Sequence, residues 1–199
     1  PFFIAPNVKV FEKYLSKLLE VIMAHNLNIK NGKASMAYYG EEPWHGLGTR
    51  IPQRATSKQM IEVAGMDWRV EKRTARGVNV DKDGKASRYE IMRLPRQNKN
   101  EDEVLLGIVT NRYEPLQNIE AFNFFDPIIK DNKACFETAG ALGDGERVWV
   151  LAKMPDEIKV ATGDSCYKYL LLSNTHNGEG SVTVKFTAIR VVCQNTLIL

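Results

Sequence analysis

Hydrophobic and polar residues alternate with a period of two over much of the chain after Trp68, and this spacing predicts β-strands. Residues 68–80 are expected to pair with residues 87–96, because an Asp-Gly turn signal lies between them. Residues 103–117 predict a further strand that Pro115 ends. The last third predicts two long hairpins, 134–155 and 156–199.

Two segments show helical spacing instead. The first is residues 56–64, with Thr56 or Ser57 as the cap and Gly65 as the stop. The second is residues 118–131, capped by Asn118 and kinked or shortened at Pro127. The residues expected to face inward from these helices are Met60, Ile61, Ala64, Ala121, Phe122, Phe125 and Ile129. Strands dominate without a repeating βαβ order, which predicts an α+β fold: a largely antiparallel sheet built from hairpins, with two or three packed helices.

The first 22 residues have two interpretations. Their apolar residues fall at helical spacing, which favours an amphipathic helix. Residues 19–23 can also be encoded by a purine-rich ribosome-binding sequence followed by a start codon, which favours Met23 as the natural start and residues 1–22 as an upstream extension. We expect residues 23–199 to form a single domain. Because the chain stops inside an apolar run, we also expect more residues to follow.

Composition narrows the class of protein. The apolar fraction of 44% and the charged fraction of 26% are typical of a globular protein, and no apolar run is long enough to span a bilayer. Cys135, Cys166 and Cys193 are an odd number of widely spaced cysteines. We expect neither a disulfide nor a metal site from them, and this usage suits a reducing cytoplasm. Cys193 is expected to be buried between sheet and helix.

Catalytic patterns are weak. His45, His176 and Cys193 could form a Cys-His pair with a distant helper, but a cysteine in an apolar strand pattern is more often structural. The glycines near residue 48 lack the spacing of a dinucleotide or phosphate loop, and no clustered zinc-ligand motif occurs. The sequence therefore predicts no catalytic residue, no metal and no cofactor.

A basic hairpin is the main candidate for binding. It carries cations with aromatic residues beside them. Single-stranded DNA binds to such surfaces, because cations contact its phosphates and aromatic side chains stack with its bases. Alternation predicts that Trp68 and Val70 face the core with Lys72, Thr74 and Arg76, and that Arg69 and Arg73 face outward with Glu71 and Ala75. The predicted nucleic-acid-binding residues are Arg69, Lys72, Arg73, Arg76, Arg88, Arg93, Arg96, Lys185 and Arg190. The net charge of +3 permits such binding without requiring it.

A second candidate is the loop 38–52, which contains the stretch "PWHGLGT". Trp44 is expected to anchor the loop on the sheet, and Gly46 and Gly48 permit backbone conformations that other residues resist. His45 could titrate or donate to a phosphate near neutral pH. We predict a structured loop in which these four residues could hold a ligand.

Successive blocks of the chain are similar to one known family. They are "NGKASMAYYGEEPWHGLGT", "DWRVEKR", "RYEPLQNIEAFNFFD", "FETAGALGDGERVWVLAKMP" and "KYLLLSNTHNGEGSVTVKFTAIRVVCQNT". In this order they resemble the phage/plasmid-like protein family, the bacterial and viral domain of unknown function numbered 932. The resemblance supports a start at Met23 and implies that the chain continues beyond residue 199.

This resemblance implies a setting in phages, plasmids and mobile elements, but no specific activity. We expect a non-enzymatic DNA-binding accessory of replication or recombination, of the single-strand annealing type, which could act as a homo-oligomer away from membranes. This expectation rests on analogy at the level of the fold. Two alternatives stay open: a nucleic-acid-processing enzyme that uses His45, His176 or Cys193, and a protein-interaction module that acts on a host system.

Overall fold

A six-stranded sheet forms the body of the protein. The computed structural model describes residues 26–51, 55–131, 133–161 and 164–198. The sheet has the order β11-β10-β9-β8-β3-β4, and every neighbouring pair is antiparallel except β3 and β4. Its strands are β3 (Met36–Tyr39), β4 (Thr49–Ile51), β8 (Cys135–Leu142), β9 (Arg147–Ala161), β10 (Asp164–Thr175) and β11 (Thr183–Thr187). The predicted α+β fold with a largely antiparallel sheet is confirmed. The predicted extension 1–22 and start at Met23 lie outside the described residues.

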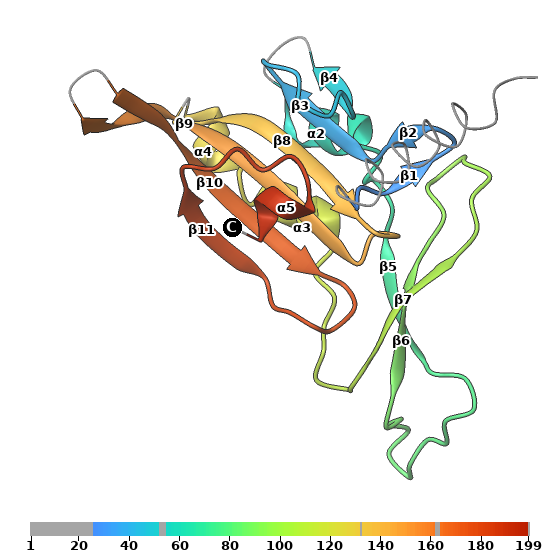
Figure 1. Ribbon diagram of the computed structural model, residues 1–199. Helices are drawn as coiled ribbons and strands as arrows, with labels where there is room; N and C mark the ends of the chain where they lie inside the picture. The colour runs from blue at the N-terminus through green and yellow to red at the C-terminus, as the bar shows by residue number, and fades with distance from the viewer. Residues whose placement is uncertain (1–25, 52–54, 132, 162–163, 199) are drawn as a thin grey trace, which may run out of the picture.

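A three-stranded sheet, which we call the arm, projects from this body (Figure 1). It consists of β5 (Val70–Thr74), β6 (Tyr89–Arg93) and β7 (Val104–Val109), all antiparallel. The pairing of β5 with β6 confirms the predicted hairpin, and Gly84 N donates to Asp81 O in its turn. A small two-stranded sheet joins β1 (Ile29–Lys30) to β2 (Lys33–Ala34).

Four short helices are described: α2 (Ser57–Val63), α3 (Asn118–Asn123), α4 (Asp126–Lys130) and α5 (Gln194–Leu197). The predicted cap of α2 is confirmed, because the Thr56 side chain accepts from Gln59 N. The predicted cap at Asn118 is wrong, because Gln117 is the cap and the Asn118 side chain is buried. The predicted interruption near Pro127 is confirmed, since α3 ends at Asn123 and α4 begins at Asp126 as a separate helix. The C-terminal apolar run was expected to be strand, but it forms α5 after Cys193.

Two hydrophobic clusters lie on opposite faces of the six-stranded sheet. Along β10, Leu170 and Leu172 belong to one cluster, and Tyr169 and Leu171 belong to the other. The first cluster includes the predicted inward residues Met60, Ile61, Ala64, Ala121, Phe122 and Phe125, with Ile129 packed against it. The second lies under the C-terminal segment, whose Val191, Val192, Cys193 and Leu197 are buried. Figure 1 shows α5 on one side of the sheet and α3 and α4 on the other.

Glycine and glutamine contacts attach the arm to the body. A Cβ on Gly107 of β7 would lie 2.6 Å from Asn177 Cα in the turn after β10, so only glycine allows this close approach. The Gln117 side chain bonds both backbone polar groups of Val70, accepting at 3.0 Å and donating at 2.9 Å. Trp68, Val70 and Ile91 of the arm are buried in the first cluster. The arm is therefore packed on the body at its base.

Candidate functional site

The predicted basic surface is largely neutralised by carboxylates. Arg73 donates to Glu103 at 2.7 and 2.9 Å and to Glu71 at 2.7 Å. These bonds raise the pKa of Arg73 and lower the pKa values of both carboxyls. The charge of Arg73 is therefore matched within the arm. The outward placement of Arg69 and Glu71 is confirmed, and Trp68 and Val70 are buried as predicted.

Lys72 holds the chain that follows β7. Its Nζ donates to Asn111 O at 2.8 Å, to Tyr113 O at 2.6 Å and to Glu114 Oε1 at 3.1 Å, and it lies over the ring of Tyr89. The side chain is 16% exposed. Lys72 therefore stabilises the fold, which leaves few of its donors for a phosphate.

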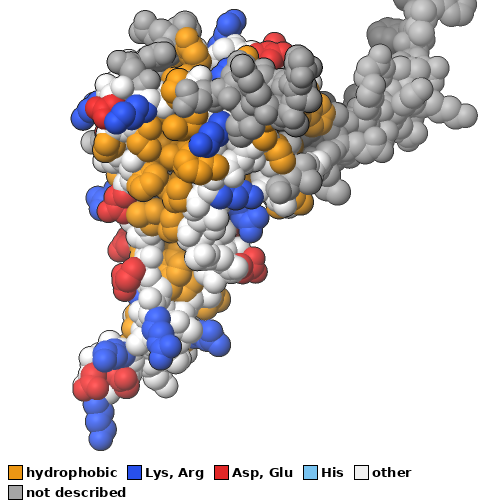
Figure 2. All heavy atoms as spheres, turned by 90° about the vertical axis from the view of Figure 1, so that its left-hand side faces the viewer, with side chains coloured by type: hydrophobic (Ala, Val, Ile, Leu, Met, Phe, Trp, Pro, Cys, Tyr) orange, Lys and Arg blue, Asp and Glu red, His pale blue; other side chains and the backbone are white. Residues whose placement is uncertain are grey.

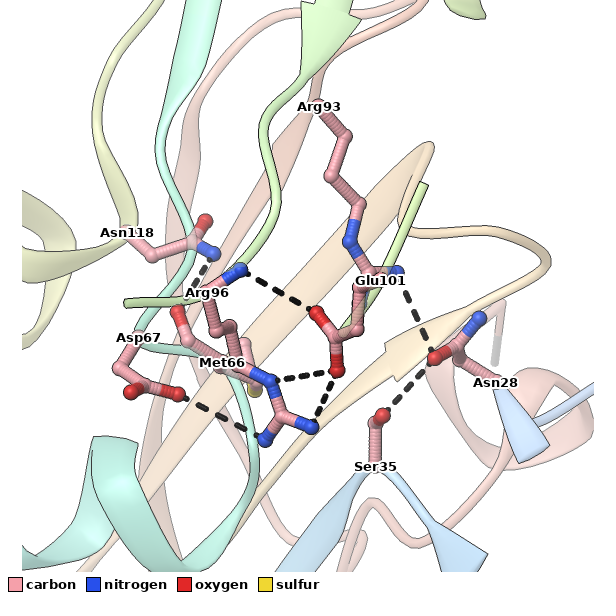
Figure 3. Close-up of polar contacts among 8 residues, drawn as sticks. All are labelled: Asn28, Ser35, Met66, Asp67, Arg93, Arg96, Glu101 and Asn118. Atoms are coloured by element: carbon pink, nitrogen blue, oxygen red, sulfur yellow. Dashed lines mark hydrogen bonds and ion pairs between the residues drawn. The ribbon is translucent and has the colours of Figure 1, made fainter. Parts of the chain in front are cut away.

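Arg93 is buried, so its prediction as a surface cation is wrong. It is 2% exposed, its guanidinium carbon lies 4.8 Å from the Trp68 ring centre, and its Nη1 donates to Asp144 O at 2.6 Å. A weaker bond of 3.5 Å reaches Asn28 Oδ1. Burial lowers the pKa of Arg93. Figure 3 shows the side chain pointing toward Asn28.

Arg96 is bound by two carboxylates (Figure 3). Its Nε and Nη2 donate to Glu101 Oε1 at 2.9 and 2.5 Å, and its Nη1 lies 3.7 Å from Asp67 Oδ1. The hydrogen bond with Glu101 raises the pKa of Arg96, and the pKa of Glu101 falls correspondingly. Arg96 therefore holds the loop between β6 and β7 in place, and its charge is matched by carboxylates.

The two predicted cations from the last third of the chain have different settings. Lys185 is exposed on β11, the edge strand of the six-stranded sheet. Arg190 donates from Nε to Glu137 Oε1 at 2.5 Å and from Nη2 to Glu41 O at 2.6 Å. Neither residue lies in the arm.

The free cations of the arm gather at its far end. We call residues 75–88 and 110–112 the arm tip. Its five cations are exposed: Arg76, Lys82, Lys85, Arg88 and Arg112. None of them takes part in an ion pair with another described residue. Figure 2 shows Lys and Arg side chains gathered at the narrow lower end of the molecule, where the arm tip lies.

A fixed turn supports the arm tip. The Asp81 carboxylate accepts from Asp83 N at 2.9 Å and from Lys85 N at 2.8 Å, so it is engaged with the backbone. Beside the turn lies a hollow of about 660 Å³, lined in part by Val80, Lys85 and Arg112. Lys82, Lys85 and Arg112 were not among the predicted binding residues, although the predicted turn carries Lys82 and Lys85. Ala75, predicted to face outward, is buried because β5 ends at Thr74 and the alternation ends with it.

The "PWHGLGT" loop connects the parallel strands β3 and β4. The prediction that Trp44 anchors this loop on the sheet is wrong, because Trp44 is 70% exposed. His45 is half-buried: its Nδ1 accepts from Leu47 N at 3.0 Å, and its Nε2 donates to Val192 O at 3.1 Å. Burial lowers the pKa of His45, and the bond to Val192 opposes this shift. His45 thus ties the loop to the C-terminal segment.

Gly46 and Gly48 adopt positive φ angles of 68° and 106°. A Cβ on Gly48 would lie 3.3 Å from both Met36 and Tyr38. Both glycines therefore adopt backbone conformations that other residues resist, and Gly48 also lets the loop approach β3 closely, which agrees with the predicted structured loop. The role of the loop in ligand binding stays a prediction.

Two residues of the enzyme alternative, His176 and Cys193, are not brought together. His176 lies against Trp68, with its ring centre 5.4 Å away, and its Nε2 is 3.0 Å from Asn118 Oδ1. Cys193 belongs to the second cluster, on the opposite face of the sheet, and is fully buried. The predicted burial of Cys193 is confirmed. Within the described part of the chain, no group of His, Cys, Asp and Glu could hold a metal ion.

These features define an α+β protein with a largely antiparallel sheet and a β-arm whose tip is basic. The model of the family described as "Domain of unknown function (DUF932)" matches residues 105–199, which agrees with the family resemblance of the sequence over this part of the chain. The match begins in β7 and includes α3, α4, α5 and β8 to β11. No curated protein and no solved structure matches the chain. No described helix is long and apolar enough to cross a membrane.

Proposed function

We propose that this protein is a non-enzymatic accessory of DNA replication or recombination in phages or plasmids, and that it binds single-stranded DNA through the arm tip. The observation that carries the proposal is the gathering of five exposed cations, none of which forms an ion pair with a carboxylate among the described residues, at the end of a projecting arm. Cations that are free before binding can release counterions from DNA phosphates when they bind.

The charge balance favours the arm tip over the rest of the arm as the DNA-binding surface. Its five cations face two carboxylates, Asp81 and Asp83, so its net charge of +3 equals that of the whole chain. Elsewhere in the arm, Arg73 and Arg96 each face two carboxylates. A cation that must break such pairs before it contacts a phosphate gains less from binding. The proposal therefore moves the predicted interface away from Arg73, Arg93 and Arg96 and keeps Arg76 and Arg88.

The shape of the arm tip supports a single strand as the partner. The hollow beside the turn carries Val80, which is 54% exposed, between cationic side chains. An apolar surface beside phosphate-binding groups suits an unstacked base, which a single strand presents more readily than a duplex. The single-strand annealing activity itself rests on the fold-level analogy.

A homo-oligomer stays part of the proposal. β11 is an edge strand, and its Val184 and Phe186 are 45% and 58% exposed. Figure 2 shows hydrophobic side chains gathered on the side of the molecule that carries β11. An uncovered edge strand offers backbone groups with which a second copy could pair.

The test compares two variants that remove the same charge. Arg76→Ala/Arg88→Ala should weaken binding of oligothymidylate by roughly tenfold or more, because a hydrogen bond to a charged group contributes about 1.5–3 kcal/mol. Lys33→Ala/Arg50→Ala removes two exposed cations from β2 and β4 and should leave binding close to the parent. Equal weakening by both variants would mean that net charge, and not the arm tip, determines binding.

A further inference from the structure

A second site lies on the six-stranded sheet, at a distance from the arm tip. The strand register places Cys135 of β8, Lys153 of β9 and Tyr169 of β10 side by side. Residues that are directly opposite on neighbouring strands share a face, here the face of the second cluster. A pocket of about 570 Å³ lies over these three residues.

A buried ion pair forms one side of this pocket. Glu137 is an extra residue in β8, since Phe136 pairs with Ala152 and Thr138 pairs with Leu151. Such a bulge redirects a side chain. The Glu137 side chain is 9% exposed and accepts from Arg190 Nε at 2.5 Å, while Arg190 Nη2 donates to the backbone oxygens of Tyr39 and Glu41. These bonds hold the guanidinium in place, and its Nη1 has no hydrogen-bond partner among the described residues.

An aromatic surface with a cation forms the other side. Tyr167 is 45% exposed, and its ring centre is 6.5 Å from that of the buried Tyr169. Lys153 Nζ lies 3.1 Å from the centre of the Tyr167 ring. Burial, with a smaller effect from Glu137, raises the pKa of Tyr169 to about 12, so its hydroxyl stays a hydrogen-bond donor at neutral pH.

We propose that this pocket binds a nucleotide, with the planar base against Tyr167 and the phosphate between Lys153 and Nη1 of Arg190. An aromatic face binds any base by stacking, and two cationic donors suit a phosphate. The volume lies within the range of about 300–1,000 Å³ that is usual for small-ligand sites. A free nucleotide and a nucleotide within a single strand present the same chemistry. The site is separate from the arm tip and does not depend on the proposed function.

The opposite face of the same sheet offers a matched control. There Lys168 Nζ lies 4.2 Å from the centre of the Phe186 ring, so Lys168 and Phe186 reproduce the pair formed by Lys153 and Tyr167. Lys168 shares its face with Leu170, which belongs to the first cluster. The control pair has neither the pocket nor the buried ion pair beside it.

The experiment titrates the four deoxynucleoside monophosphates and, separately, oligothymidylate into the whole chain and its variants. Tyr167→Leu should weaken binding by roughly 5- to 150-fold, the range found when one stacking side chain is removed, and Tyr167→Phe should restore it. Lys153→Met should weaken binding most at low salt. The control Lys168→Met, which leaves Phe186 of the edge strand in place, should bind like the parent.

The two probes distinguish the source of the nucleotide. If Tyr167→Leu weakens binding of the monophosphates, the pocket accepts free nucleotides. If it weakens binding of the oligonucleotide alone, the pocket accepts a base from a strand. If Tyr167→Leu binds every probe as the parent does, or if no probe binds the parent, the proposal is overturned. Because the arm tip is intact in these variants and Arg76→Ala/Arg88→Ala leaves the pocket intact, the two proposals fail independently.

Discussion

The buried His176 predicts a specific dependence of stability on pH. Burial lowers the pKa of His176 from 6.5 to about 4. Its Nε2 donates to Asn118 Oδ1 at 3.0 Å, because the Asn118 amide nitrogen donates to Met66 O. Its Nδ1 is buried without a hydrogen-bond partner among the described residues. The folded protein therefore holds the neutral imidazole, and a proton on Nδ1 would be buried without an acceptor.

The sign and magnitude of this pH dependence follow from the linkage between protonation of His176 and folding. The unfolded chain takes up this proton below pH 6.5 and the folded protein takes it up only near pH 4, so stability is lost as the pH falls between these values. The difference between the two pKa values corresponds to about 3 kcal/mol of unfolding free energy, which is fully present above pH 6.5.

Urea denaturation over a series of pH values tests this prediction. His176→Gln keeps an amide donor for Asn118 but cannot titrate, so its stability should fall by about 3 kcal/mol less than that of the parent from pH 7 to pH 4. His45→Gln serves as the control. His45 is half-buried and hydrogen-bonded to Val192 O, so its removal should change the pH dependence less. If the parent and His176→Gln lose stability in parallel, the charged imidazole is accommodated in the folded state and the reasoning is refuted.

Two further predictions concern the core. Gly140→Ala should lower the unfolding free energy by about 1–3 kcal/mol, because the added Cβ overlaps the ring of Trp149, and unchanged stability in thermal or urea unfolding would contradict the packing described for β8 and β9. Cys193 should react with a thiol reagent far more slowly in the native protein than in urea, because it is fully buried, whereas rapid native labelling would revive it as a candidate nucleophile.

Local patterns in the sequence predicted most of the elements. The hairpins follow from alternation and turn residues, and α2 follows from Thr56, its apolar face and Gly65, because each signal lies within a few residues. The C-terminal segment was missed because its apolar run suits a buried strand and a short buried helix equally. Packing decides between the two. Val191, Val192 and Cys193 pack against one face of the six-stranded sheet and do not form one of its strands.

The sites could be predicted only in part, because alternation does not show which cations meet carboxylates. The sequence around Arg93 does not show that this residue is buried, because the turn that covers it contains Asp144, which is 51 residues away. The partners Glu137 and Arg190 are 53 residues apart, and the bulge at Glu137 has no local signature. Arg88 is exposed, as expected for a DNA-binding residue. Arg76, which alternation placed on the core-facing side, is exposed because β5 ends at Thr74 and the alternation ends with it.

The salt dependence of DNA binding tests the central claim most directly. Fluorescence anisotropy with labelled oligothymidylate gives the affinity of the parent and of Arg76→Ala/Arg88→Ala at several salt concentrations. For single strands, the slope of log K against log salt falls by about 0.7 for each phosphate that the protein no longer neutralises, so the variant should have a slope smaller by about 1.4. The Lys33→Ala/Arg50→Ala control should keep the slope of the parent. A parent that does not bind, or an arm-tip variant whose slope equals that of the parent, would contradict binding of single-stranded DNA through the arm tip.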